Sequence, residues 1–368
     1  MKKEILQVLD DLLKIQSVSS DIEKLDEVTD YIKQYFDCIE NCYIDVLRFN
    51  DKPSIVVKNF DGKKADIILN GHYDVVPPSE DGQFEPKEID GKIYARGSGD
   101  MKAWDAVMMV LMKEILLSEK AEKKVALILT SDEELGWLDG AAKIVEEWYR
   151  ATEGVLVPDS GSLEEIVVAE KWMLDIEVDF KGLSCHASRP WLWENAIENA
   201  YAALKELRKK LQDDDELFKS EDNWGTSVSM TKIESGTATN VIPNNARASF
   251  DIRFTEKYTM EKILEKIYKI IDRHHGQIVS TICWDLVHTP EESDFVQSYM
   301  WVYESIMWSK PTVVKEHGAS DGRFFSAKWM PLLLHRPTCE NIHSKNEWVD
   351  IEATMKIYEI YREFILGK

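Results

Sequence analysis

Two apolar patterns alternate along the first part of the chain: helical spacing and short, unbroken apolar runs. In residues 1–16, apolar side chains recur three and four positions apart, which predicts an amphipathic helix. Residues 67–69 and 125–129 are apolar runs typical of buried strands, and residues 103–117 between them have the length and composition of a buried helix. This alternation predicts an α/β layer, in which ligands bind beyond the carboxyl ends of the strands.

The pattern changes in residues 174–180, where apolar and acidic residues alternate as in a half-exposed strand. The elements predicted after this strand are a helix over 195–212, strands over 227–233 and 247–254, a helix over 260–273 and a strand over 277–286. The resulting βαββαβ order is the ferredoxin-like arrangement, so residues 174–288 predict an α+β domain inserted into the first domain. The first domain would then comprise residues 1–173 and 289–368.

Composition and charge limit the possible partners. The chain carries 67 acidic and 45 basic residues, a net charge of -22 that repels phosphate backbones and anionic lipid surfaces. Neither nucleic acid nor a membrane is therefore expected as a partner. The amino terminus has charges within its apolar stretch and no small-residue cleavage site, so no signal peptide is predicted. Five cysteines without CxxC spacing favour a reducing compartment, and we expect a cytoplasmic protein.

Five short patches carry the candidate chemistry, and they are spread over most of the chain. Their sequences are GHYDVVP (71–77), RGSGDMK (96–102), SDEELG (131–136), PDSG (158–161) and NIHSKNEWV (341–349). Together they offer two imidazoles and several carboxylates, the ligands of a two-metal hydrolytic site.

The first two patches supply a histidine and a shared carboxylate. Residues two apart on an extended backbone point to the same side, so Asp74 can accept the second ring N–H of His72 and fix its tautomer. Asp100 follows two glycines that permit close backbone approach, and its carboxylate can bridge two cations. A surface loop with a stray histidine, and an ordinary turn or dinucleotide loop, are the alternatives for these patches.

The other three patches add a base and further ligands. Glu133 and Glu134 follow an apolar strand, so one can bind metal while the other accepts a proton. Asp159 and His343 provide one more ligand each. A solvated helix start, Asp-Ser-Gly turn chemistry and a structural histidine are the respective alternatives.

In this order the five patches resemble the family of dinuclear zinc aminoacylases and peptidases, which includes succinyl-diaminopimelate desuccinylase, acetylornithine deacetylase, carboxypeptidase G and peptidase T. The resemblance extends over nearly the whole chain. It implies a zinc-peptidase-like catalytic α/β domain with an inserted ferredoxin-like lid or dimerisation domain. It also implies two Zn²⁺ ions, with Co²⁺ or Mn²⁺ as possible substitutes, and a homodimer.

The resemblance also implies a role for each residue of the patches. His72, Asp100 and Asp159 would hold one zinc, Asp100, Glu134 and His343 the other, while Asp74 orients His72 and Glu133 is the general base. The peptide bond after Asp100 is typically cis in the family.

Two segments of the inserted domain resemble parts of the family's substrate site. One is GLSCHASRPWLWENAI, and its resemblance implies that His186 stabilises the oxyanion. In the family this histidine often comes from a partner subunit. TNVIPNNARASFDIRF nominates Asn240 and Arg253 for substrate binding, with Arg253 suited to grip a substrate carboxylate. The alternatives are a loop histidine for His186 and a solvent-facing strand residue for Arg253.

We therefore expect a metal-dependent hydrolase that cleaves an amide bond of a small N-acyl amino acid, in the manner of a desuccinylase or deacetylase. The segment HGASDGRFF favours that branch, although Ala319 stands where desuccinylases commonly have Thr. Asp159 favours the alternative of a dipeptidase or aminopeptidase, because desuccinylases usually have Glu there. A catalytically silent metal-binding relative is the alternative of another class.

Overall fold

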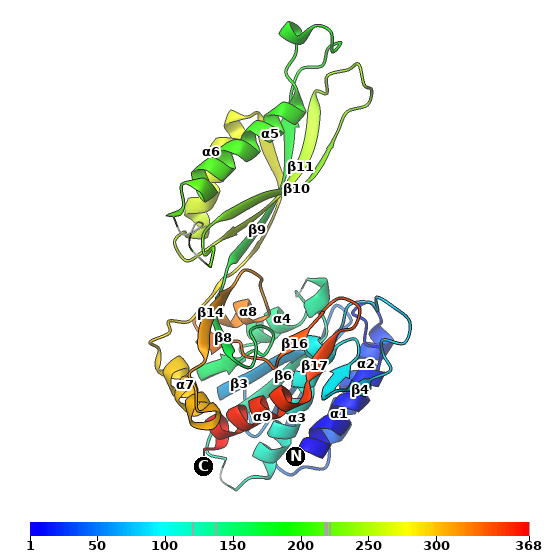
Figure 1. Cartoon of the computed structure of the whole chain (residues 1–368), viewed down its shortest axis with the longest axis vertical. Coiled ribbons are helices and arrows are strands. Elements are labelled where there is room, and N and C mark those ends of the chain that lie inside the picture. Colours follow the sequence, from blue (N-terminus) through cyan, green and yellow to red (C-terminus); the bar gives the residue numbers. More distant parts are fainter. Residues whose placement is uncertain (120, 137, 217–219, 221, 368) are drawn as a thin grey trace. The chain divides into compact units, whose positions relative to one another are not determined.

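The computed structural model describes residues 1–119, 121–136, 138–216, 220 and 222–367, which form two compact units. Unit 1 comprises Met1–Ala169, Val287–Glu316 and Ser320–Lys368, and unit 2 comprises Glu170–Leu286 and His317–Ala319. The chain thus leaves unit 1 and returns to it after an inserted segment, as Figure 1 shows by its colours.

Unit 1 contains most of the helices and strands. Its helices are α1 (Lys2–Lys14), α2 (Ile22–Phe36), α3 (Ala103–Leu117), α4 (Ala141–Glu146), α7 (Asp294–Met307), α8 (Gly322–Ser326) and α9 (Ile351–Leu366). Its strands are β1 (Tyr43–Phe49), β2 (Lys52–Lys58), β3 (Lys64–His72), β4 (Lys87–Ile89), β5 (Lys92–Tyr94), β6 (Val125–Thr130), β7 (Arg150–Leu156), β8 (Glu165–Glu170), β13 (Val287–His288), β14 (Thr312–Glu316), β15 (Leu332–Leu333), β16 (Cys339–Glu340) and β17 (Trp348–Asp350).

The main sheet of unit 1 has the order β1-β2-β6-β3-β7-β15, and its β6, β3, β7 and β15 run parallel. Alternate residues of β6 enter two separate cores. Val125, Leu127 and Leu129 pack with α1, α2, α3, α7 and α9, whereas Ala126 and Ile128 pack with α4 and α8. The apolar run predicted as a strand is therefore buried on both faces, and unit 1 is a three-layer α/β/α structure.

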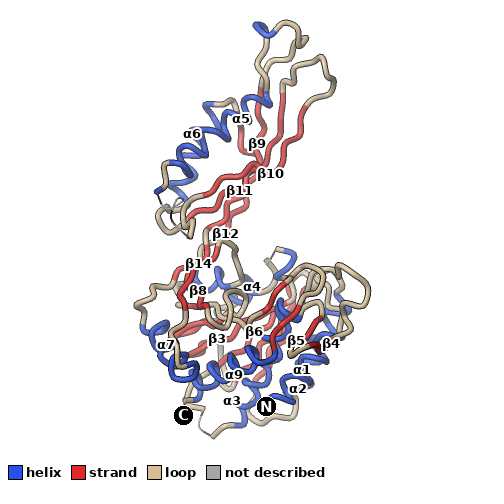
Figure 2. The backbone as a smooth tube through the Cα atoms, viewed as in Figure 1, coloured by secondary structure: helices blue, strands red, loops and turns tan. Residues whose placement is uncertain are grey.

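Smaller sheets complete unit 1. One has the order β13-β8-β14, and the other, β16-β17-β5-β4, joins the segment before α9 to the segment before α3. Figure 2 shows β4, β5, β8 and β14 of these sheets among the loops of unit 1.

Unit 2 has the βαββαβ order predicted from the sequence. Its elements are β9 (Trp172–Lys181), α5 (Ala196–Leu207), β10 (Ser227–Ser235), β11 (Asn245–Phe254), α6 (Met260–Arg273) and β12 (Gly276–Trp284). The antiparallel sheet has the order β10-β11-β9-β12. The apolar residues of segment 174–180 are buried against α5 and α6, while the acidic residues between them lie on the other face. The predicted fold class, α/β with an inserted ferredoxin-like domain, is confirmed.

Within the part of the chain that the structure describes, no helix is long and apolar enough to cross a membrane. All five cysteines are free thiols.

Candidate metal centre

Three parallel strands deliver site residues to one edge of the main sheet. His72 is the last residue of β3, Glu133 and Glu134 follow β6, and Asp159 follows β7. Because the strands are parallel neighbours, their carboxyl ends lie side by side, and the side chains that follow them meet there.

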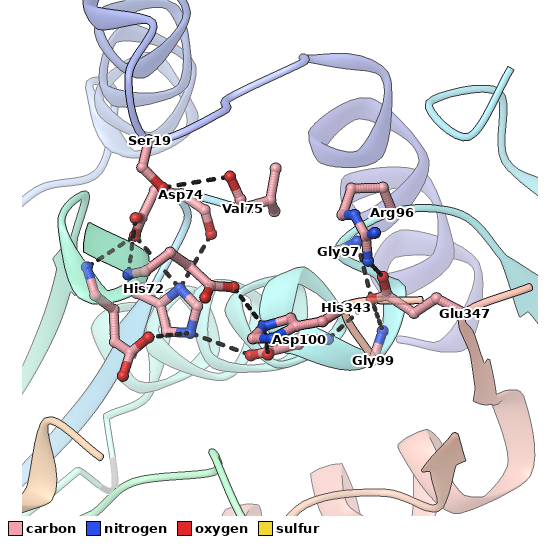
Figure 3. Close-up of polar contacts among 12 residues, drawn as sticks. Ser19, His72, Asp74, Val75, Arg96, Gly97, Gly99, Asp100, His343 and Glu347 are labelled. Carbon is pink, nitrogen blue, oxygen red and sulfur yellow. Dashed lines mark hydrogen bonds and ion pairs between the residues drawn. The ribbon is translucent and has the colours of Figure 1, made fainter. Parts of the chain in front are cut away.

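Asp100 and His343 reach the same place from two turns. Asp100 lies in the turn that leads into α3, and its peptide bond to Met101 is cis, as the family resemblance implied. His343 lies between β16 and β17 and has a left-handed backbone with φ 58°. Figure 3 shows both side chains beside His72.

The five residues nominated as ligands form two overlapping groups. One is His72, Asp100 and Asp159, and the other is Asp100, Glu134 and His343; within each, the ligand atoms lie within 4.8 Å of one another. Asp100 belongs to both groups. Its Oδ1 lies 3.2 Å from Nε2 of His72, and its Oδ2 lies 2.9 Å from Nε2 of His343. The arrangement allows one carboxylate to bridge two cations.

The donor atoms fit divalent cations. His72 Nε2 and Asp100 Oδ1 are buried, and neither makes a well-directed hydrogen bond with any described residue although they face each other. Burial raises the pKa of Glu134 above its ordinary value, and the neighbouring Asp100 carboxylate adds to this. Clustered carboxylates of this kind are costly without positive charge, and nitrogen and oxygen ligands together suit zinc.

The carboxylates raise the pKa values of the two histidines. Burial opposes protonation of His72, but Asp100 and Asp74 outweigh it and raise its pKa well above the ordinary value. Hydrogen bonds to Asp100 and Glu134 raise the pKa of His343 to about 10. Both imidazoles therefore lie in a strongly negative field that also attracts cations.

Asp74 contacts more than its expected partner. The ring Nδ1 of His72 lies 3.1 Å from the backbone oxygen of Asp74 and 3.4 Å from its carboxylate Oδ1, so the closer acceptor is the carbonyl. The carboxylate accepts the backbone N–H groups of Glu133 and Glu134, each at 3.2 Å. This buried side chain thus connects β3 to the two glutamates, a contact that spacing along one strand cannot reveal.

Glu133 lies beside His72 but belongs to neither ligand group. Its Oε2 is 3.9 Å from Nε2 of His72, and the side chain is 10% exposed. Burial raises the pKa of Glu133 well above its ordinary value; His72 opposes this, while Asp159 and Asp321 reinforce it. A carboxylate with this environment has a high affinity for a proton.

The three remaining nominated residues lie in unit 2. His186 and Asn240 are both exposed. They are adjacent, because His186 forms a β-bridge with Val241 and the N–H of Ala187 donates to the backbone oxygen of Asn240 at 2.9 Å. Arg253 lies on β11 and is paired with Asp251, two residues earlier on the same face, at 2.9 Å. Its guanidinium is thus held in place by a carboxylate of its own strand.

Three charged residues for which the sequence predicts no role hold the site's loops. Arg96 and Glu347 form a buried ion pair, and Arg336 donates to the backbone oxygens of Asp159 at 3.1 Å and Gly161 at 3.2 Å. Arg96 and Glu347 lie inside the patches already singled out. Two opposite charges within such patches are a signal that could have suggested the pair.

Residues 68–367 match the model of the peptidase family M20/M25/M40. The chain belongs to this family. A curated relative, the succinyl-diaminopimelate desuccinylase of Hydrogenovibrio crunogenus, is 30% identical over 321 residues, covering 82% of this chain and 83% of the relative. The family and the two ligand groups make the protein a metal-dependent hydrolase of amide bonds.

Solved structures of peptidases share the fold. Aminopeptidase PepT from Bacillus cereus has a TM-score of 0.80 at 19% identity, covering 100% of this chain and 98% of that one. A dinuclear metal binding peptidase of the M20 family from Bacillus subtilis has a TM-score of 0.69 at 16% identity, covering 99% and 97%. At these identities the likeness concerns the fold.

Proposed function

We propose that this M20 hydrolase removes the acyl group from a small N-acyl amino acid, using two zinc ions held by His72, Asp100, Asp159, Glu134 and His343. The observation that carries the proposal is the pair of ligand groups that share Asp100. The similarity to succinyl-diaminopimelate desuccinylase over most of the chain favours a substrate of this class. Cobalt or manganese would suit the same mixed nitrogen and oxygen ligands.

The chemistry supplied by the bound cations is Lewis acidity at the scissile carbonyl and at the attacking water. Glu133 takes a proton from that water and returns it to the leaving amine nitrogen. Its support is its buried position beside His72, because burial raises its proton affinity. Asp74 aids this step because it fixes the backbone N–H groups of Glu133 and Glu134.

His186 is proposed to donate a hydrogen bond to the oxyanion. The protein would be a homodimer, in which each His186 acts at the site of the partner subunit. The backbone N–H of Ser188 donates to Nδ1 of His186 at 3.2 Å. A backbone N–H cannot accept, so Nδ1 bears the lone pair, and the neutral ring carries its proton on Nε2. This tautomer offers a donor for a developing negative charge.

Asn240 and Arg253 are proposed to bind the substrate, with Arg253 contacting its carboxylate. Asp251 occupies one edge of the guanidinium through Nε and Nη2, which leaves Nη1 for a substrate oxygen. Arg253→Lys would keep the charge but lose the planar fork, and we expect it to raise KM more than it lowers kcat.

A substrate panel distinguishes this proposal from a dipeptidase, which Asp159 favours. The zinc-loaded protein is assayed against N-succinyl and N-acetyl amino acids and against dipeptides. Faster turnover of the N-acyl amino acids supports the proposal, and faster turnover of dipeptides replaces it with the peptidase function. Zinc binding without turnover of either class would favour the silent relative.

Three variants test the assigned roles. Glu133→Gln should lower kcat by about 10²–10⁴-fold while the bound zinc stays unchanged, because a general base contributes roughly that much. Mixed dimers of Glu133→Ala and His186→Ala should regain part of the activity that each variant lacks. If exchanged heterodimers regained no activity, this would contradict the action of His186 across subunits. The cytoplasmic location stays a prediction from the cysteines.

A further inference from the structure

A single buried carboxylate holds the turn that presents Asp100. Oε1 of Glu347 accepts the backbone N–H groups of Gly97 at 2.9 Å, Gly99 at 2.9 Å and Asp100 at 3.2 Å. Its other oxygen, Oε2, forms an ion pair with Arg96. The side chains of Glu347 and Arg96 are 0% and 1% exposed, and Figure 3 shows them beside the glycines of the turn.

The turn has a shape that few other sequences would adopt. Gly97 has a left-handed backbone with φ 85°. A Cβ on Gly99 would lie 3.1 Å from Ile342 and 3.2 Å from Cys339, so the turn packs closely against the segment that carries His343. Backbone of this kind exposes several N–H groups on one side, and a carboxylate oxygen satisfies them together.

The same network reaches the turn of His343. Glu347 follows His343 by four residues, and Gln83 donates to the backbone oxygen of Ser344 at 2.8 Å. Ser79 receives a hydrogen bond from Arg96 at 3.1 Å and is 3.4 Å from the His343 backbone oxygen, to which it donates. The turns of Asp100 and His343 are therefore held by one connected set of contacts, of which the Glu347–Arg96 pair is the buried part.

Glu347 lies near the ligands without being one of them. It belongs to neither ligand group formed by the described residues. Its negative charge repels the Asp100 carboxylate, so its presence there is unfavourable unless its hydrogen bonds compensate. Arg96 supplies the opposite charge, and the three N–H groups supply the remaining donors.

We propose that Glu347 is a positioning residue that fixes the 97–100 turn and thereby aims Asp100 at both cations, with Arg96 neutralising its charge. The inference rests on the proposed metal centre, since its effect passes through Asp100. Residues that orient metal ligands through hydrogen bonds commonly change metal affinity when they are replaced.

The test compares Glu347→Gln with Glu114→Gln. A glutamine has nearly the same shape, but its NH₂ must face either Arg96 or the backbone N–H groups, and either contact sets donor against donor. Glu114 also pairs with an arginine, Arg362, at 2.7 Å, but it lies far along α3 from Asp100. It therefore controls for the loss of a carboxylate that pairs with an arginine away from the site.

Zinc affinity of each metal-free protein is measured by competition with a chromophoric chelator, and folding by chemical unfolding. Glu347→Gln should raise the zinc dissociation constant by about 10- to 100-fold. Glu114→Gln should leave it unchanged, whatever it does to stability. Wild-type zinc affinity in Glu347→Gln would overturn the positioning role, whereas a wild-type protein that binds no zinc would refute the metal centre itself.

Hydrogen exchange in the wild-type, metal-free protein covers the case in which Glu347→Gln does not fold. The amides of Gly97, Gly99 and Asp100 should exchange much more slowly than those of the exposed residues 80–82. Equal exchange in the two segments would show that the turn is not held before metal binds, and would overturn the inference.

Discussion

Replacing Asp74 by Asn should impair both the site and the fold, because three site residues depend on this carboxylate. It is fully buried, accepts the N–H groups of Glu133 and Glu134 at 3.2 Å each, and lies 3.4 Å from the His72 ring. An asparagine keeps one oxygen, but its NH₂ faces the second N–H. One buried N–H then has no acceptor.

The expected magnitude follows from that lost acceptor. A buried polar group without a partner costs about 1–3 kcal/mol, so the free energy of unfolding should fall by about that amount. The displaced Glu133 backbone and the less constrained His72 should lower kcat/KM by about 10- to 100-fold, as replacement of such supporting residues commonly does.

The assay combines denaturant unfolding of the metal-free protein with steady-state kinetics at saturating zinc. Asp66→Asn is the matched control, since Asp66 lies near the other end of β3 and accepts the Lys124 backbone N–H at 2.8 Å. Asp66→Asn should lower the free energy of unfolding but leave kcat/KM unchanged. If Asp74→Asn kept wild-type kcat/KM while losing stability as the control does, the assigned role of Asp74 would be wrong.

Two further predictions concern stability. Burial lowers the pKa of His335 from 6.5 to about 4, so the folded state binds this proton less readily than the unfolded state. The free energy of unfolding should therefore fall as pH falls below about 6.5, by about 2 kcal/mol between pH 7.5 and 5. His335→Gln should remove this part of the pH dependence in chemical unfolding, and an unchanged slope would contradict it. Gly154→Ala should destabilise by about 1–3 kcal/mol, because its Cβ would lie 2.3 Å from the Phe295 ring. Gly318→Ala, with nothing within 4 Å, is its control, and equal unfolding midpoints for the two variants would refute the steric argument.

The fold was predictable where the apolar pattern is strong. The helices over 103–117 and 260–273 have the bounds expected from the sequence, because a long apolar stretch and a clear amphipathic face leave little choice of register. The apolar run 125–129 was recognised as a buried strand for the same reason. Its two-faced packing follows from helices that are distant in sequence.

The candidate site was predictable as a set of ligands but not as a network. His72, Asp100 and Asp159 could be nominated because imidazole and carboxylates follow strands or glycines in patches that resemble a known family. Contacts such as Asp74 to the Glu133 backbone, or Glu347 to the Asp100 turn, join segments far apart in sequence. Periodicity does not show which of these distant segments lie together, and residue type indicates at most that opposite charges such as Arg96 and Glu347 could pair.

Metal stoichiometry of Asp100→Asn tests the central claim most directly. Asp100 belongs to both ligand groups, whereas Asp159 belongs to one. Titration of the metal-free proteins with zinc should give two ions per chain for the wild type, loss of high affinity at one site for Asp159→Asn, and loss at both for Asp100→Asn. Two ions bound to Asp100→Asn with wild-type affinity would contradict the shared-carboxylate centre.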